Sequence, residues 1–152
     1  MQDGNRNRNY GQQSYGRQQN PVENPRTFFN NLVFDPNWIK TGANEEMVEY
    51  SERVGRYLAD NGLTNSKIRN IYGEIKRIQM GKFSSEASSF YLLKPKVAYA
   101  YGREKNNKGL ELFKLVFDQS IALVESDGSN FKHFSNFLEA ILAYHKSYGG
   151  KD

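Results

Sequence analysis

Cysteine is absent from this chain of 152 residues, and histidine, proline and tryptophan are scarce. The lack of cysteine excludes disulfides and zinc sites built on thiolates. No apolar run approaches the roughly 20 residues that a helix needs to span a membrane. The first residues are polar, unlike those of a signal peptide. We therefore expect a cytoplasmic protein that makes no contact with a membrane.

Motifs for catalysis or metal binding are also missing. The sequence has no His-Glu-x-x-His motif, no phosphate-binding Gly-Lys-Ser/Thr loop and no Gly-x-Ser-x-Gly motif. His133 and His145 are 12 positions apart on one expected helix, too far apart to share a metal, and we expect His145 to be a hydrogen-bonded core residue. One acidic run is typical of a solvated helix face: Glu45, Glu46, Glu49 and Glu52. We expect no enzyme activity, no cofactor and no metal site.

Positive charge is concentrated in the middle of the chain. The stretch 64–108 holds ten Lys or Arg residues and three acids, a net charge of +7, whereas the whole chain carries +4. The remaining residues therefore sum to −3. A basic centre between acidic flanks is typical of a protein that binds a polyanion such as a nucleic acid.

The chain divides into three parts. Residues 1–26 are rich in Asn, Gln and Arg, and we expect a disordered tail because almost nothing in them can be buried. This tail is either an arm that contacts RNA or an inert extension. Residues 27–43 are apolar but irregular, with Pro36 limiting any helix, and they cover either the core of the domain or a partner subunit. Residues 44–150 form the helical domain.

Apolar residues recur at helical spacing in five segments, and no segment alternates with the period of a strand. The predicted fold is therefore all-α, a compact bundle of about five helices. Asn44, Thr64 and Ser129 are the expected N-caps of three of them. Pro95 is expected either to kink the third helix or to begin a new one. The expected helices span residues 45–60, 65–80, 85–105, 110–125 and 130–147.

Two helix faces in the basic stretch could bind a nucleic-acid backbone. On the second helix Arg69, Gly73 and Arg77 follow one another at steps of four. Gly73 either allows a bulky ligand to approach or is a neutral surface residue. On the third helix Lys96, Tyr99 and Arg103 share a side. Cations can bind phosphates, and an aromatic ring can contact a base or a sugar.

Three stretches resemble the small subunit of type III-A CRISPR (Csm) effector complexes, and the similarity extends over residues 45–150. The first is Gly-Leu-Thr-Asn-Ser-Lys-Ile-Arg-Asn at 62–70, and the second is Lys-Pro-Lys-Val-Ala-Tyr-Ala-Tyr-Gly-Arg at 94–103. The third is Phe-Leu-Glu-Ala-Ile-Leu-Ala-Tyr-His-Lys at 137–146. The second and third stretches together are the specific ones.

The resemblance implies a non-catalytic helical protein of antiviral defence. Several copies would stack along the duplex of guide RNA and target RNA, beside larger backbone and signature subunits. By this analogy the third stretch would form core contacts and contacts between copies. The RNA-facing residues would be Lys67, Arg69, Arg77, Lys94, Lys96, Tyr99 and Arg103. The helix faces select the same residues independently, except Lys67 and Lys94. The alternative is a helical protein-interaction module whose basic face binds an acidic partner.

Overall fold

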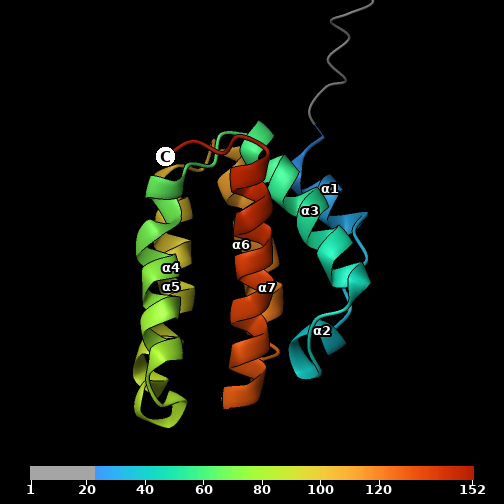
Figure 1. The fold of residues 1–152 in the computed structure, drawn as a ribbon. Coiled ribbons are helices and arrows are strands. Elements are labelled where there is room, and N and C mark those ends of the chain that lie inside the picture. The colour runs from blue at the N-terminus through green and yellow to red at the C-terminus, as the bar shows by residue number, and fades with distance from the viewer. Residues whose placement is uncertain (1–22) are drawn as a thin grey trace, which may run out of the picture.

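The computed structural model describes residues 23–152, which form α-helices, one short 3-10 helix and no strand (Figure 1). The predicted all-α bundle is confirmed. All five long helices that the periodicity predicts are present in this part of the chain, with two short helices before them. The tail expected to be disordered spans residues 1–26, of which residues 1–22 lie outside the described part of the chain and residues 25–26 begin a helix.

The segment 27–43 is not wholly irregular, and the boundary expected at residue 26 falls inside a helix. Helix α1 spans Pro25–Asn30, and the side chain of Asn24 caps it by accepting a hydrogen bond from the backbone N–H of Arg26. Helix α2 spans Asn37–Lys40, directly after Pro36. Proline is compatible with the start of a helix because the first N–H groups there need no partner within the helix. Pro36 therefore precedes a helix and does not exclude one.

Aromatic side chains attach this N-terminal segment to the core of the same domain. The Phe34 and Trp38 ring centroids are 5.3 Å apart, and the Trp38 ring lies 5.0 Å from that of Tyr50 on α3 and 6.2 Å from that of Phe137 on α7. Trp38 is 2% exposed. Burial of such rings is a large stabilising contribution. Of the two alternatives that the sequence left open, the core of the domain or a partner subunit, the segment therefore covers the core of its own domain.

Helices α3 and α4 have the predicted bounds. Helix α3 spans Glu45–Asp60, and the side chain of Asn44 caps it, accepting from Met47 N at 2.9 Å as predicted. Helix α4 spans Asn65–Met80. Thr64 precedes α4, but its side chain does not cap the helix; its hydroxyl is paired with that of Ser66 instead.

Helix α5 runs without interruption through a proline. It spans Ala87–Arg103 and follows the 3-10 helix η1 at Phe83–Ser85. Pro95 lies inside α5 on its exposed side, so the alternative of a new helix beginning there is wrong. Proline cannot donate to the carbonyl of Tyr91 one turn earlier, but water can reach that side of the helix.

The last two helices each begin two residues earlier than expected, and the first of them also ends earlier. Helix α6 spans Lys108–Ile121 and ends four residues early, before a turn in which Glu125 and Ser126 have positive φ. Helix α7 spans Gly128–Ser147. Its N-cap is Asp127 and not Ser129, because the Asp127 carboxylate accepts the hydrogen bond from Asn130 N at 2.9 Å.

Helices α6 and α7 form the middle of the bundle, with α4 and α5 on one side and α1 to α3 on the other (Figure 1). This position explains the wide apolar face of α7, because Phe137 is fully buried by the N-terminal segment. His145 is a core residue as predicted; it is fully buried, and its Nε2 lies 2.6 Å from the carbonyl oxygen of Leu63. That contact joins α7 to the loop before α4.

Candidate nucleic-acid interface

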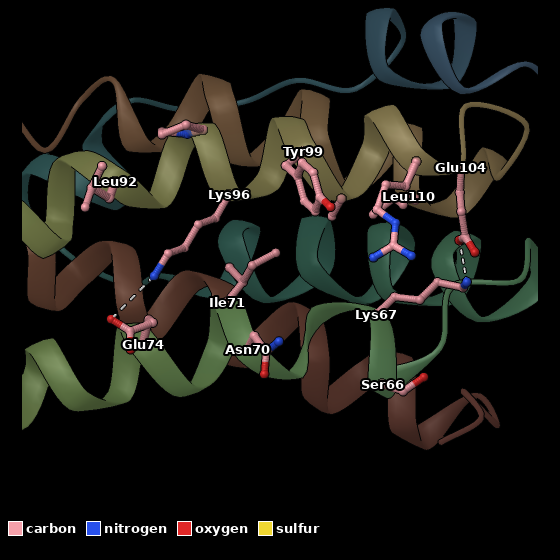
Figure 2. Close-up of a pocket in the computed structure, with 13 residues that line it drawn as sticks. Ser66, Lys67, Asn70, Ile71, Glu74, Leu92, Lys96, Tyr99, Glu104 and Leu110 are labelled. Carbon is pink, nitrogen blue, oxygen red and sulfur yellow. Dashed lines mark ion pairs between the residues drawn. The ribbon is translucent and has the colours of Figure 1, made fainter.

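A groove of about 880 Å³ runs between the antiparallel helices α4 and α5 (Figure 2). We call it the α4–α5 groove. Four of the seven predicted RNA-facing residues line it, and they come from both stretches of the basic centre. Its lining is Ser66, Lys67, Asn70, Ile71, Glu74, Leu92, Pro95, Lys96, Tyr99, Ala100, Arg103, Glu104 and Leu110.

The two lysines of the groove face carboxylates across it. The ammonium of Lys67 on α4 is paired with Glu104 at the end of α5, and Nζ of Lys96 on α5 lies 3.8 Å from Oε2 of Glu74 on α4 (Figure 2). These pairs are partly exposed, and such pairs contribute little to stability. A phosphate that enters the groove can therefore replace the carboxylates at modest cost.

Glu74 is the centre of a further network at the other end of the groove. Hydrogen bonds from Arg77, together with the positive charge of Lys96, hold the pKa of Glu74 below its ordinary value. Arg77 also donates to Glu86 at 2.8 Å and to the hydroxyl of Ser89 at 2.8 Å. Its hydrogen bonds with Glu74 and Glu86 raise the pKa of Arg77. Arg77 therefore joins α4 to the beginning of α5.

Tyr99 is the aromatic side chain of the groove, and it is 68% exposed. The guanidinium carbon of Arg103, one turn later on α5, lies 5.8 Å from the centroid of its ring. This distance fits a cation–π contact. The predicted set of Lys96, Tyr99 and Arg103 thus shares one side of α5, facing the groove.

The other three predicted RNA-facing residues do not line the α4–α5 groove. Arg69 is exposed on the side of α4 that faces α7, where it lines a second groove of about 470 Å³ with Tyr72 and Glu139. Lys94 is exposed on α5 but does not line the α4–α5 groove. Arg77 also lies outside it. Arg69 and Arg77 on α4 therefore do not line the same groove.

Sequence reasoning missed the polar and apolar lining between the cations. Asn70 is an exposed groove residue, whereas Leu92 is an exposed apolar residue that a helical pattern does not separate from the core. The pairing of Glu74 with Arg77 has a local signal, because residues three apart on a helix are neighbours. The pairing of Glu104 with Lys67 has none, since it depends on how the two helices pack.

The acidic surface lies on the opposite side of the bundle from the groove. Four glutamates of α3 have exposed or half-exposed side chains: Glu45, Glu46, Glu49 and Glu52. Helices α6 and α7 separate α3 from α4 and α5 (Figure 1). The domain therefore has a basic and an acidic side, and the basic side would face a polyanion.

Residues 23–152 contain neither a membrane-spanning helix nor a cluster of metal-binding side chains. None of the helices there is long and apolar enough to cross a membrane. No cluster of three or more metal-binding side chains occurs in the same residues.

Comparison with known proteins identifies the family. The model of the family described as "Csm2 Type III-A" matches residues 42–151, which is more than half of the chain. Neither the comparison with curated proteins nor the comparison with solved structures gave a match. The matched region contains all three stretches of the resemblance and every residue of the α4–α5 groove. The chain therefore belongs to the Csm2 family, the small subunits of type III-A CRISPR Csm effector complexes.

Proposed function

We propose that this Csm subunit is non-catalytic and holds RNA by its backbone, without reading sequence. Several copies stack along the duplex of guide RNA and target RNA, beside the larger backbone and signature subunits, in the cytoplasm. The observation that carries the proposal is the α4–α5 groove, where Lys67, Lys96 and Arg103 surround an exposed Tyr99. Family membership supports the place in the complex.

The chemistry of the groove suits a phosphate chain. Lys67 and Lys96 come from different helices, so they can contact successive phosphates along one strand. Arg103 adds a planar donor that can bind a phosphate with two hydrogen bonds. Such contacts depend on salt, because bound phosphates release their counterions. They also occur with any base sequence, which is what a subunit working with many guides requires.

Charge reversal in the groove tests this function. We expect Arg103→Glu and Lys96→Glu to weaken RNA binding for two unrelated sequences alike, and to lower the slope of log K against log salt by about 1 for each lost contact. Lys132→Glu is the matched control, since Lys132 is an exposed α7 residue outside both grooves. Fluorescence anisotropy with labelled RNA measures binding, first with the full chain and then with the assembled complex.

Arg69→Glu distinguishes the two grooves. If the α4–α5 groove holds the RNA, Arg69→Glu weakens binding less than Arg103→Glu does, because Arg69 lines the groove on the α7 side. Equal affinity of the wild type and both groove variants in the assembled complex, at matched salt and helicity, would overturn the proposal. That result would favour a protein partner for the basic side.

A further inference from the structure

We propose that the α4–α5 groove also holds one unstacked RNA base against the ring of Tyr99. This inference rests on the proposed function and adds a ligand to it. The ligand is a nucleotide whose base lies outside a duplex stack, with its phosphates on the cations of the rim. A base inside a duplex has both faces covered by its neighbours, so it could not reach the ring.

The exposure of Tyr99 is the first observation. Tyr101 lies two positions later on the same helix, and it is half-buried with its hydroxyl donating to Glu111 at 3.0 Å. Tyr99 has no such place in the core, and 68% of it remains exposed beside the groove. Arg103 contacts the ring at 5.8 Å but leaves most of it accessible. An exposed ring between cations is the usual platform for a base in proteins that bind single strands.

The lining of the groove is the second observation. Ile71, Leu92 and Pro95 give it carbon surface on both helices, and Leu92 is 54% exposed. Phosphates alone would need no apolar surface, whereas the flat faces of a base would bury against it. The volume of about 880 Å³ lies within the roughly 300–1,000 Å³ of small-molecule sites. The groove is therefore large enough for a base together with its ribose.

The charge distribution fits a nucleotide and not a neutral apolar segment. Lys67, Lys96 and Arg103 lie around the apolar lining. The amide of Asn70 lines the same groove and can both donate and accept a hydrogen bond. One amide can pair with an edge of any base, so the site should tolerate all four bases. Tolerance of sequence at this position agrees with the proposed function.

Strands with and without bases provide the test. The full chain is titrated at low salt with an all-adenine RNA of about ten nucleotides, a length typical of single-strand sites. An abasic strand with the same number of phosphates is the second probe. We expect the wild type to bind the RNA more tightly than the abasic strand, by about 5-fold to 150-fold, because stacking one base contributes that much.

Two variants test whether the ring of Tyr99 causes the preference for the base-bearing strand. Tyr99→Ala should lose the preference for the base-bearing strand while it keeps its affinity for the abasic strand, and Tyr99→Phe should retain the preference. Tyr91→Ala is the matched control, because Tyr91 is 60% exposed on the same helix but does not line the groove. Both positions are at the surface, so circular dichroism should show that all three variants are folded.

The outcomes separate the inference from the proposed function. Equal binding of both strands by the wild type, or an equal loss with both strands for Tyr99→Ala, would overturn the base site and leave backbone binding intact. Failure of the chain to bind either strand would overturn the base site, whereas the proposed function is decided by the charge-reversal variants in the assembled complex. Loss of the preference in Tyr91→Ala but not in Tyr99→Ala would also reject the groove as the site.

Discussion

Nζ of Lys96 lies 3.8 Å from Oε2 of Glu74, so an ion pair crosses the groove that is proposed to hold RNA. The two residues come from different helices, and both are partly exposed. Glu74 neutralises part of the positive charge of the groove in the absence of RNA. An incoming phosphate must therefore compete with this carboxylate for Lys96.

Removing the charge of Glu74 should strengthen RNA binding. The variant Glu74→Gln keeps the size of the side chain, releases Lys96 and takes away repulsion between carboxylate and phosphate. We expect affinity at low salt to rise by up to about fivefold, since partly exposed charge pairs are worth up to ~1 kcal/mol. The gain should disappear at high salt because the charges are screened. Anisotropy titrations at several salt concentrations measure both effects.

Glu45→Gln is the matched control for this gain. Glu45 is an exposed acid on α3, on the other side of the bundle, and the same change of net charge there should alter affinity much less. If Glu74→Gln binds RNA more weakly than the wild type, Glu74 holds Lys96 in its binding position and does not compete with RNA.

The helices could be predicted because each one repeats apolar residues over several turns. The α3 bounds and the Asn44 cap follow directly from that pattern. The short helices α1 and α2 could not be predicted, because four to six residues contain too little of the period. Their packing is decided by aromatic contacts with distant residues, such as Trp38 against Phe137.

The candidate site could be predicted only as a set of residue types. Helical spacing correctly grouped Lys96, Tyr99 and Arg103 on the side of α5 that faces the groove. It also placed Arg69 and Arg77 on one face of α4. In the structure Arg69 lies on the side of α4 that faces α7, whereas Arg77 pairs with Glu86 at the start of α5. Which side of a helix meets which neighbour depends on the packing of the whole bundle, and one sequence does not encode it locally.

Arg77 should support the fold more than it supports RNA binding. Its guanidinium donates to Glu74, Glu86 and Ser89, so Arg77→Ala removes the connection between α4 and the start of α5. We expect a lower melting temperature, with a smaller loss of RNA affinity than Arg103→Ala shows. Thermal unfolding followed by circular dichroism and anisotropy titrations measure the two effects. The opposite order, a larger loss of affinity for Arg77→Ala, would place the RNA at the η1 end of α4.

Two glycines inside helices should respond to alanine in opposite ways. A Cβ at Gly55 would lie 2.6 Å from Cβ of Tyr144 and 2.7 Å from the carbonyl oxygen of Ile141, so α3 would have to move away from α7. We expect Gly55→Ala to cost about 1–3 kcal/mol or more, as overpacking does. A Cβ at Gly73 would meet nothing within 4 Å. Gly73→Ala should therefore stabilise the domain by up to about 1 kcal/mol. Urea unfolding measures both changes.

The variant Gly73→Ala also tests whether Gly73 allows RNA to approach α4 closely. If RNA passes close to the exposed backbone at Gly73, Gly73→Ala weakens RNA binding although it stabilises the fold. Unchanged affinity would make Gly73 a neutral surface residue. A loss of stability in Gly73→Ala would contradict the open surroundings that the structure gives this position.

The stability of the domain should fall in alkaline solution partly through Tyr57. Burial, with smaller contributions from Glu111 and Glu23, raises the pKa of Tyr57 to about 12, whereas a tyrosine in the unfolded chain ionises near pH 10. Below about pH 10 both states keep the proton, so the contribution to stability is complete. Between about pH 10 and 12 only the unfolded chain loses it, and stability should decrease by ~1.4 kcal/mol per pH unit.

Tyr57→Phe tests this assignment because it removes the titrating group and keeps the ring, whose centroid lies 4.5 Å from that of Phe28. The variant loses the hydrogen bond from the hydroxyl to the carbonyl of Glu23, so below pH 10 it should be less stable by about 1 kcal/mol. Burial also raises the pKa of Tyr50 and Tyr101, but both tyrosines remain in the variant and affect the two proteins equally. Urea unfolding at pH 8 to 12 should therefore show the two stability curves converging above about pH 10 and crossing at about pH 11, beyond which the variant is the more stable protein. Parallel curves over that range would mean that Tyr57 ionises equally easily in the folded and unfolded chains.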